Sequence, residues 1–491
     1  MTFLQLFDII HEVDAKINKK TKKLWSHQQD ARMLASKSIA DGFGILHDIG
    51  TGKTCTMIHI LKDMYQKEGR ILPTLIICPL SVVYNWQREF EQFAPELLAE
   101  TAVAVGTAKQ KYQMFDSEHK IIITNFDTFR APRTGTKRLF EMLVVDESHF
   151  CKNPSANRTK NIHNLADLAS YRYILTGTPI TKNYMDLWGQ FRIISKFIFG
   201  KSFYHFKHKY FYNKNAGKSW FTFPDWAMRD KIVPEGISAK EHIEQKLKIY
   251  SHRATKAEAL DLPELVRVKY DVELTPELKK IYDEVKKSFV SFLDDYGNAK
   301  ISVDLVLTQI MRLQQIANGI VKLDDSDEPV VLATAKTKCL KELLEQITQK
   351  EKVIVWSCFI PNYAQISDVC KNIRLEYSML VGSMNAKEKQ ASIDRFNTDT
   401  SCKVMIANQG AGGTGINLIA TSTMIYFSKN YDWAKDEQSQ GRCYRGGSEM
   451  HKQITRIDIV TRNTIEQDIT SALKHKMLLN DFIMNLKNKG D

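Results

Sequence analysis

Short apolar runs rich in branched residues recur along the chain, and each leads into a polar or glycine-containing turn. In the first part of the chain they read GFGIL, TLIIC, KIIIT, EMLVVD and YRYILT. Helix-compatible stretches lie between several of them, an alternation typical of a parallel sheet wound by helices. A second series follows after about residue 350, with KVIVWS, CKVMIA, TMIYFS and ITRIDIV and helical stretches such as AKEKQASIDRFN. The pattern predicts an α/β fold with two similar lobes.

The region between the two series, from about residue 185 to 335, is mostly helical in pattern, with aromatic residues and lysines mixed. Its segment KSFYHFKHKYFYNKNAGKSWFTFPDW allows two interpretations. Basic aromatic segments can stack on nucleic acid, but large aromatics at irregular spacing more often pack helices together, and we favour packing. Near the end of the chain, TIEQDITSALKHKMLLNDFIMNL predicts a helix that braces the lobes. Its apolar face would hold Ile465, Ile469, Leu473, Met477 and Leu478.

The stretch LHDIGTGKTCTMIHIL indicates a phosphate-binding loop. A full Walker pattern reads G-x-x-x-x-G-K-[ST], and His47 holds the position of its first glycine, so the pattern is only partly met. A chance Gly/Lys/Thr cluster in a lysine-rich turn is the alternative. The context favours the loop, because the apolar GFGIL precedes it and a helix-compatible run follows, which would point backbone N–H groups at phosphates. Lys53 would then reach the β and γ phosphates and Thr54 would bind Mg²⁺.

Two adjacent carboxylates end the apolar run EMLVVDESH. In a nucleotide triphosphatase, Asp146 would hold Mg²⁺ and Glu147 would orient and deprotonate the attacking water. The alternative is an exposed acidic strand end. It requires the apolar run, the acidic pair and the upstream loop to coincide by chance.

A third candidate is EQSQGRCYR, which carries Arg442 and Arg445 and follows the glycine-rich NQGAGGTGINL. Arginines delivered from a second lobe can stabilise the charge that develops on a transferred phosphoryl group. A pair of arginines three residues apart is otherwise more often a solvated helix face.

Length, charge and cysteine content further limit which kinds of protein the sequence can encode. The chain has 491 residues, too many for one ordinary core, and its 69 Lys+Arg exceed its 57 Asp+Glu to give a net charge of +12. That charge favours a polyanionic partner but also fits mere solubility. The eight cysteines are scattered without a C-x-x-C pair, so neither a zinc module nor a disulfide framework is indicated. Because the N-terminal segment lacks a basic stretch and ILPTLIICPLSVVY is interrupted by prolines, we expect a soluble, intracellular chain without a membrane anchor.

Taken together, these segments resemble helicase superfamily two, and within it the Swi/Snf-like ATP-dependent DNA translocases, from about residue 24 to 470. LWSHQ resembles the adenine-recognising segment and HDIGTGKT the phosphate loop. IICPLSVVYNWQREF carries the Pro79, Trp86 and Glu89 pattern, and ITNFDTFR, DESH, CKNPSANRTK and LTGTPITKNYMDLW resemble the motifs that follow. HRATKAEALDLPELV resembles the crossing between lobes, LTQIMRLQQIANG a helix of the second lobe's insertion, and LVGSMNAKEKQASIDRFN, GAGGTGINL and QSQGRCYR the second-lobe motifs.

The resemblance implies two RecA-like lobes, each a parallel sheet wound by helices, with helical insertions and a C-terminal bracing helix. It implies an ATP-binding lobe over residues 1–262 with an insertion at about 185–260, a second lobe over 263–462 with an insertion at about 275–335, and a bracing helix with a basic tail over 463–491. It also implies an ATP hydrolase that uses ATP and Mg²⁺. Its active residues would be Lys53, Asp146, Glu147, Arg442 and Arg445.

Further roles are carried over from the motifs. Nucleotide would be bound by Gln28, Gly50, Thr51, Gly52, Lys53, Thr54, Gly415 and Gln438. Metal would be held by Thr54 and Asp146, and the lobes would be coupled through His149, Thr176, Gly177 and Thr178. The nucleic-acid backbone would be contacted by Thr128, Arg130, Thr414 and Asn417, although each of these can instead only pack its own loop.

The chain departs from the usual Swi/Snf-like pattern in three places. Ser428 stands where an acidic residue is usual, YDW replaces W-N-P, and RCYRGGS replaces R-A-H-R-I-G-Q, so that Tyr444 takes the place of a histidine. The chain also resembles a bare motor of bacterial or viral type without accessory domains. These departures weaken any inference about chromatin substrates.

The resemblance implies translocation along duplex or branched DNA, contacted mainly through its backbone, by a monomer in the cytoplasm of a bacterium or virus-infected cell, or in a nucleus. The alternatives are a strand-separating helicase or RNA-directed enzyme, a nuclease-coupled motor and a binding scaffold without turnover. The nuclease alternative rests on PDW at Pro224 and EQK at Glu244, a match expected by chance in a chain rich in Lys and Glu. The scaffold is disfavoured by the intact set of active residues.

Overall fold

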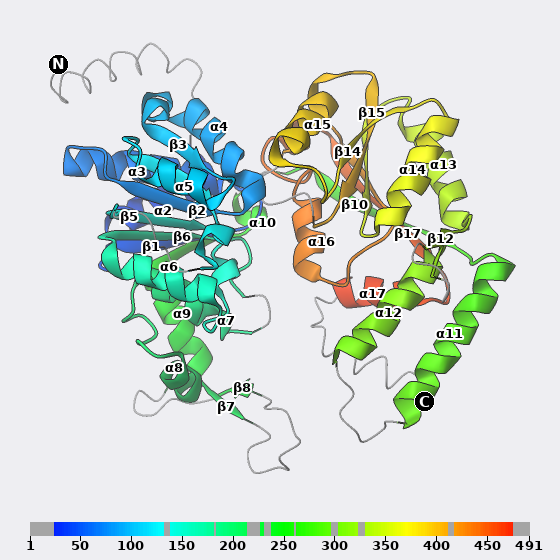
Figure 1. Ribbon diagram of the computed structural model, residues 1–491, viewed down its shortest axis with the longest axis horizontal. Helices are drawn as coiled ribbons and strands as arrows, with labels where there is room; N and C mark the ends of the chain where they lie inside the picture. The colour runs from blue at the N-terminus through cyan, green and yellow to red at the C-terminus, as the bar shows by residue number, and fades with distance from the viewer. Residues whose placement is uncertain are drawn as a thin grey trace. The chain divides into compact units, whose positions relative to one another are not determined.

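The computed structural model describes residues 24–131, 138–180, 183–213, 226–229, 237–259, 262–295, 303–322, 329–410 and 417–474. The chain divides into two units, and the second begins at Leu262. We refer to the units as lobe one and lobe two. Most of their elements are labelled in Figure 1.

Lobe one is built on a seven-stranded sheet in the order β3-β4-β2-β5-β6-β1-β9. All of its strand pairs are parallel. Its strands are β1 (Gly42–His47), β2 (Thr74–Cys78), β3 (Thr101–Ala104), β4 (Ile121–Asn125), β5 (Met142–Asp146), β6 (Tyr171–Leu175) and β9 (Ser251–Ala254). The carboxyl ends of parallel strands share one edge of the sheet, so β1, β5 and β6 bring their following loops together.

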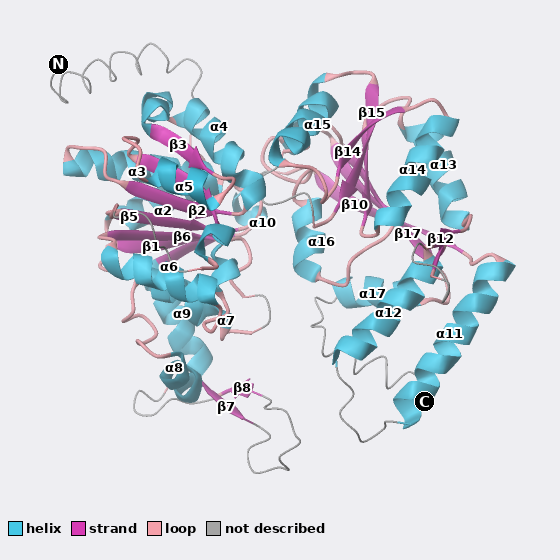
Figure 2. Cartoon of the chain, in the orientation of Figure 1, coloured by secondary structure: helices cyan, strands magenta, loops and turns pink. Residues whose placement is uncertain are grey.

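Helices cover both faces of this sheet (Figure 2). Alternation along β2 shows why: Leu75 and Ile77 belong to one hydrophobic cluster with α6, α7 and α9, whereas Ile76 and Cys78 belong to another with α3 and α4. The helices are α2 (Ser26–Ser36), α3 (Lys53–Glu68), α4 (Val83–Phe93), α5 (Ala108–Phe115), α6 (Asn157–Leu168), α7 (Asp186–Ile194), α8 (Phe203–Tyr210), α9 (Ala239–Tyr250) and α10 (Lys256–Ala259). A short antiparallel pair, β7 (Phe211–Asn213) and β8 (Trp226–Met228), follows α8.

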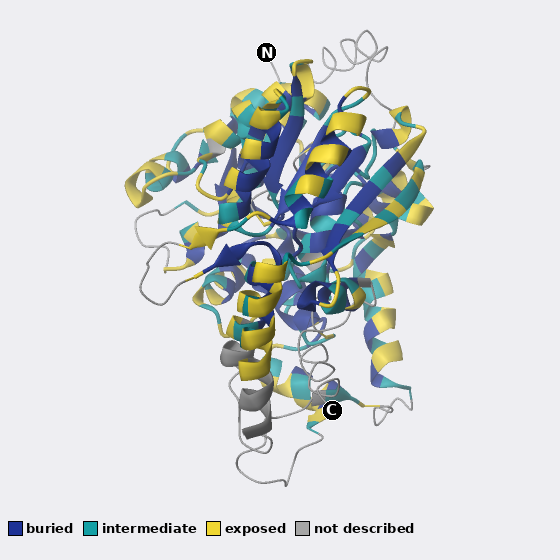
Figure 3. Ribbon diagram, turned by 90° about the vertical axis from the view of Figure 1, so that its right-hand side faces the viewer, coloured by how far each residue is buried: buried dark blue, intermediate teal, exposed yellow. Residues whose placement is uncertain are grey.

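Lobe two repeats the plan with a six-stranded sheet in the order β10-β17-β16-β13-β15-β14. Its pairs are also all parallel. The strands are β10 (Glu264–Val272), β13 (Val353–Ser357), β14 (Glu376–Leu380), β15 (Cys402–Asn408), β16 (Thr423–Tyr426) and β17 (Gln453–Thr461). Figure 3 shows the central strands in dark blue and the outward sides of the helices in yellow, as expected for amphipathic helices on a sheet.

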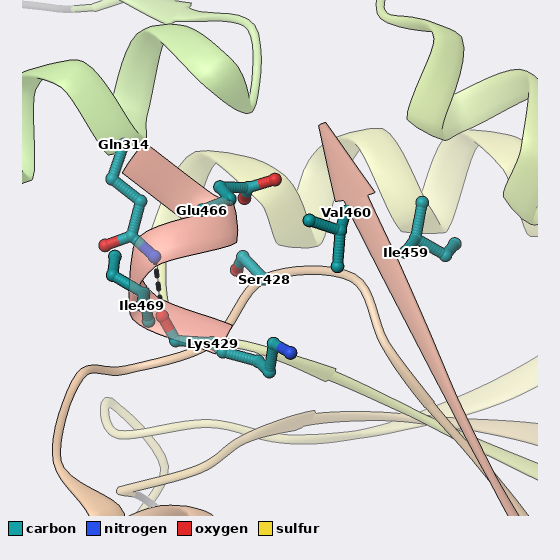
Figure 4. A pocket seen from close by; sticks show the side chains of 7 residues that line it. All are labelled: Gln314, Ser428, Lys429, Ile459, Val460, Glu466 and Ile469. Atoms are coloured by element: carbon teal, nitrogen blue, oxygen red, sulfur yellow. Dashed lines mark hydrogen bonds between the residues drawn. The ribbon is translucent and has the colours of Figure 1, made fainter. Parts of the chain in front are cut away.

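The helices of lobe two are α11 (Pro276–Asp295), α12 (Val303–Ala317), α13 (Ala335–Ile347), α14 (Ile360–Asn372), α15 (Ala386–Thr398), α16 (Trp433–Gln440) and α17 (Ile465–Lys474). A two-stranded ribbon joins β11 (Ile320–Val321) to β12 (Val330–Val331). The insertion helices α11 and α12 form their own apolar cluster with α17. Within it, the Gln314 side-chain amide donates to the Lys429 carbonyl at 2.6 Å, beside the small pocket drawn in Figure 4. The insertion is therefore anchored to the strand end after β16.

The prediction of two parallel α/β lobes is confirmed, and both are RecA-like. All nine runs that the apolar pattern singled out as strands are strands, with ends shifted by a few residues. Four strands of the two main sheets were not predicted, namely β3, β9, β10 and β14, and neither were the short strands β7, β8, β11 and β12. The described part of residues 185–335 is mostly helical, as expected, but it also contains β9 and β10, neither of which has a continuous apolar run.

Two side predictions fall partly within the described residues. In the aromatic segment, Phe206, Tyr210 and Phe211 are buried in the lobe-one core, which confirms the packing interpretation for them, whereas Tyr204 and Tyr212 are exposed. Of the predicted C-terminal face, Ile465, Ile469 and Leu473 are buried on α17 against α12, and Met477 and Leu478 lie outside the described residues.

Candidate active site

The predicted phosphate loop connects the end of β1 at His47 to the start of α3 at Lys53. Gly50 and Gly52 have φ angles of 87° and 79°, in the left-handed region that favours glycine. A side chain at Gly52 would also collide with the Gln28 amide, 2.3 Å from the ideal Cβ position. Both glycines are therefore required by backbone conformation, and Gly52 also by the close approach of Gln28.

The side chains around the loop are held by its own carbonyl groups. The Lys53 ammonium donates to the carbonyls of His47 at 3.1 Å and Asp48 at 3.3 Å. The Gln28 amide donates to the carbonyls of Thr51 and Gly52, at 3.4 and 3.2 Å. Gln28, predicted to contact adenine, is thus buried against the phosphate loop, and Lys53 can exchange its carbonyl partners for phosphate oxygens.

The acidic pair follows β5 on the same lobe. Asp146 accepts a hydrogen bond from the Trp86 indole at 3.0 Å and another from the backbone N–H of Glu147 at 2.9 Å. Burial, and then the neighbouring Glu147, raise the pKa of Asp146 to about 6, while Lys53 opposes the shift. Two buried carboxylates that repel each other in this way are a suitable donor set for a divalent cation, and Thr54 is the second residue of the helix after the loop.

Among the described residues, no group of three or more His, Cys, Asp and Glu side chains is arranged to hold a metal ion. This does not conflict with the predicted Mg²⁺, since nucleotide-bound Mg²⁺ typically takes only one or two protein carboxylates.

The predicted coupling residues meet the acidic pair. His149 Nδ1 lies 3.2 Å from a Glu147 carboxylate oxygen, 3.2 Å from the Thr176 hydroxyl and 3.5 Å from that of Thr178. Glu147 itself has a φ of 51°, a strained conformation for a residue with a long side chain. The geometry links the turn after β5 to the turn after β6.

Gly177 lies between these two hydroxyl residues and explains their approach to the phosphate loop. An ideal Cβ at Gly177 would be 2.9 Å from Ile49 Cγ1, 3.2 Å from Ile49 N and 3.3 Å from the His47 carbonyl oxygen. Only glycine allows this contact without displacing the loop. Lobe one thus brings together Lys53 and the predicted acidic and coupling residues.

The predicted arginines lie in lobe two, in the turn after α16. Arg442 is 2% exposed, its carbonyl accepts from the backbone N–H of Leu418 at 3.1 Å, and Arg445 and Gln438 are half-buried. Gly415 and Thr414 lie outside the described residues.

The predicted nucleic-acid contacts differ in exposure. Thr128 is half-buried and donates to Asn125 at 3.2 Å, which fits the loop-packing alternative. Arg130 is exposed and pairs with Asp127 at 2.8 Å. Asn417 is exposed, and its carbonyl accepts from Asn397 at 3.2 Å.

Sequence reasoning missed several residues that position the site. Trp86 was noted only as part of a family pattern, although its indole holds Asp146. Arg456, 2% exposed, donates to both carboxylate oxygens of Asp436 on α16 at 2.8 and 2.9 Å and stacks over Tyr426. The apolar alternation of β17 did signal a strand, but no local pattern marks Arg456 as the anchor of the arginine-bearing segment.

The structure also places Ser428, which departs from the family pattern, and one of the residues behind the nuclease alternative. Ser428 is 1% exposed, shares a hydrogen bond with Ser357 at 2.9 Å and accepts one from the backbone N–H of Cys358 at 3.0 Å. Of the nuclease echo, Pro224 lies outside the described residues, and Glu244 accepts a 3.4 Å hydrogen bond from Tyr184. In the part of the chain that the structure describes, no helix combines the length and apolarity needed to cross a bilayer.

Comparison with known proteins identifies two matched regions. A family model described as the SNF2-related domain matches residues 28–320, and one described as the helicase conserved C-terminal domain matches residues 335–447. A Mycoplasma pneumoniae protein named as an ATP-dependent helicase is 28% identical over 94% of this chain and 42% of its own length. A Bacillus subtilis protein named as an ATP-dependent helicase/translocase is 26% identical over 91% of this chain and 47% of its own length. The chain therefore spans less than half the length of these relatives.

Among solved structures, the Sulfolobus solfataricus SWI2/SNF2 ATPase core in complex with dsDNA is 24% identical, with a TM-score of 0.43 over 93% of this chain and 91% of that chain. The two family models agree with the predicted motif order. The chain carries both domains of an ATP-hydrolysing enzyme of the helicase type. Because the first model alone matches more than half of its 491 residues, the chain belongs to the SNF2-related domain family.

Proposed function

We propose that this chain hydrolyses ATP and couples hydrolysis to translocation along double-stranded DNA. The observation that carries the proposal is the constellation in lobe one, where the phosphate loop with Lys53 meets Asp146, Glu147 and His149. SNF2-related membership and relatives named as ATP-dependent helicases support the same conclusion.

Each residue of lobe one has a distinct task in the proposed reaction. Lys53 leaves the His47 and Asp48 carbonyls to hold the β and γ phosphates, with the loop N–H groups around them. Thr54 and Asp146 would hold Mg²⁺, which neutralises phosphate charge during transfer. Glu147 orients and deprotonates the attacking water, and its contact with His149 sets the position of its carboxylate.

Lobe two supplies the remaining groups of the proposed reaction. Gln438 and Gly415 would contact nucleotide, and Arg442 and Arg445 would stabilise charge on the transferred phosphoryl group. His149, Thr176, Gly177 and Thr178 would transmit the nucleotide state. The predicted division into an ATP-binding lobe of residues 1–262, a second lobe of residues 263–462 and a C-terminal segment of residues 463–491 is also proposed, and its first boundary lies one residue from the unit boundary at Leu262.

The proposed track is duplex or branched DNA, read through its backbone. The net charge of +12 favours a polyanion, and the contacts would include Thr128, Arg130, Thr414 and Asn417. Binding should then tolerate changes of sequence and weaken steeply as salt rises. The chain would act as a monomer.

A second candidate is a strand-separating helicase, which the names of the relatives favour. ATP hydrolysis measured without nucleic acid and with duplex DNA, single-stranded DNA or RNA, together with strand displacement on a tailed duplex, separates the two. Strong stimulation by duplex without displacement supports the translocase. Stimulation by single strands with displacement supports the helicase.

Two variants complete this experiment. Glu147→Gln keeps the size of the side chain but removes the base, and should bind nucleotide while losing turnover. Glu244→Gln, on α9, is the matched control and should hydrolyse ATP as the parent chain does. The DNA substrate should remain uncleaved in both cases. Full turnover in Glu147→Gln would contradict the assigned chemistry.

A further inference from the structure

The start of the phosphate loop is joined to the last part of lobe one by three contacts. The Asp48 backbone N–H donates to the Ala254 carbonyl at 2.9 Å, and the Lys256 backbone N–H donates to the Asp48 carboxylate at 3.0 Å. The imidazoles of His47 and His252 meet at 2.9 Å between Nε2 and Nδ1. All three involve the segment of residues 252–256, which we call the exit segment because lobe two begins at Leu262.

The sheet pairs these same regions closely. Strand β9 lies parallel to β1, and an ideal Cβ at Gly44 would be only 3.0 Å from Ser251 Cβ. The register continues to the pair His47 with Ala254, so the loop and α10 leave adjacent strands side by side. A shift of residues 47–48 must therefore be accommodated by the exit segment.

A third histidine extends the contact to the other side of the loop. His27 Nε2 lies 2.9 Å from the Thr51 carbonyl oxygen, and the His27 and His47 rings are 5.1 Å apart, edge to face. Thus His27, His47 and His252 connect the loop carbonyl of Thr51 to β9 through buried or half-buried rings. The phosphate loop and the exit segment are therefore joined by a continuous series of side-chain contacts.

Lys53 gives a physical reason why nucleotide binding would affect the phosphate loop and the exit segment together. Its ammonium donates to the carbonyls of the two residues, His47 and Asp48, that hold the exit segment. Phosphate competes for the same ammonium, so filling the loop removes a charged donor from both carbonyls. This loss of hydrogen bonds affects His47 and Asp48, the residues that contact His252, Ala254 and Lys256.

We propose that His47 and Asp48 are positioning residues that carry the filled or empty state of the phosphate loop to the exit segment, and through it along the chain toward lobe two. This inference rests on the proposed function, because it requires ATP in the loop. It adds a route that is separate from the predicted coupling through His149. The competing explanation is that these contacts only fasten the edge strand β9.

Two pairs of variants isolate the Asp48–Lys256 hydrogen bond. Lys256→Pro removes the backbone donor at the first position of α10, where proline is tolerated, while Lys256→Ala loses the side chain but keeps the donor. Asp48→Ala removes the acceptor, while Asp48→Asn keeps a side-chain oxygen in its place. Lys256→Ala and Asp48→Asn are thus the matched controls.

The measurement is hydrogen exchange of residues 251–259 in the full-length chain, with and without AMP-PNP and Mg²⁺, together with kcat and KM for ATP in the presence of duplex DNA. The parent chain and both controls should show a nucleotide-dependent change in exchange. Lys256→Pro and Asp48→Ala should lose that change and show kcat lowered about fivefold, the factor that about 1 kcal/mol for one hydrogen bond represents, with KM little altered.

Each outcome decides the matter. If Lys256→Pro and Asp48→Ala bind AMP-PNP and respond like the parent chain, the contacts only fasten β9 and the proposal is wrong. If all four variants lose the nucleotide-dependent change in exchange equally, whether or not they keep the Asp48–Lys256 hydrogen bond, the proposal is also wrong. If the parent chain binds no AMP-PNP, the proposed ATPase function itself fails and this inference fails with it.

Discussion

Replacing Trp86 with phenylalanine tests whether the active site depends on a buried indole that contacts no substrate. Trp86 is fully buried, and its N–H donates at 3.0 Å to a carboxylate oxygen of Asp146, itself 6% exposed. A hydrogen bond to a charged group contributes about 1.5–3 kcal/mol. If the indole holds Asp146 in position for Mg²⁺, its loss should lower kcat/KM for ATP about tenfold or more and raise the Mg²⁺ concentration needed for half-maximal turnover.

Trp188→Phe is the matched control for this experiment. Trp188 is also buried in lobe one, and its indole donates at 3.0 Å to the neutral carbonyl of Gly200. Both variants lose the same volume and one hydrogen bond, so both should lower the melting temperature. Only Trp86→Phe should change the Mg²⁺ dependence. Equal turnover in the two variants, with unchanged Mg²⁺ dependence, would refute the positioning role of Trp86.

Three further predictions follow from buried groups. Burial, with His252, His27 and Lys53 nearby, lowers the pKa of His47 to about 2 in the folded state, whereas the pKa of an unfolded histidine is about 6.5. Between these pH values the unfolded chain binds a proton that the folded chain does not. The free energy of unfolding should therefore fall by about 1.4 kcal/mol per pH unit below pH 6.5 in denaturant titrations, and His47→Gln should reduce this slope, whereas an unchanged slope would argue against a neutral buried His47. Arg456→Met leaves the Asp436 carboxylate buried without its partner and should destabilise lobe two by about 3–5 kcal/mol, measured by chemical unfolding; a loss under about 1 kcal/mol would contradict this reasoning. Gly177→Ala forces a Cβ to 3.2 Å from Ile49 N and should weaken ATP binding about tenfold by equilibrium titration, because overpacking costs about 1–3 kcal/mol; unchanged affinity would show that the loop yields freely.

The fold was largely predictable because buried parallel strands need apolar branched residues on both faces. The runs TLIIC and KVIVWS satisfy that requirement and became β2 and β13. Strands at or near the sheet edges escape this rule. All nine residues of β10 are half-buried or exposed, and β9 consists of only four residues. Neither strand therefore carries an apolar pattern that differs from that of its helical neighbours.

The residues predicted to act on nucleotide came from short motifs, since phosphate binding and water activation each require particular side chains at fixed spacing. Lys53, Asp146 and Glu147 interact electrostatically in lobe one for this reason, and the predicted coupling residue His149 contacts Glu147. Their individual roles remain predictions.

The supporting residues obey no such local rule. Trp86 on α4 is 60 positions from Asp146 at the end of β5, and His47 on β1 is 205 positions from His252 on the neighbouring strand β9. These pairs exist only because the sheet and its covering helices bring distant elements together.

Burial also separates two arginines that the sequence motif treats alike. Arg442 is 2% exposed within lobe two, and its backbone is tied to Leu418, whereas Arg445 is half-buried. A buried guanidinium would have to become more exposed before it could reach a phosphate. In the proposed reaction, Arg445 would therefore need less rearrangement than Arg442 to reach the transferred phosphoryl group. The backbone hydrogen bond between Leu418 and Arg442 would meanwhile hold the turn after α16 that carries both arginines.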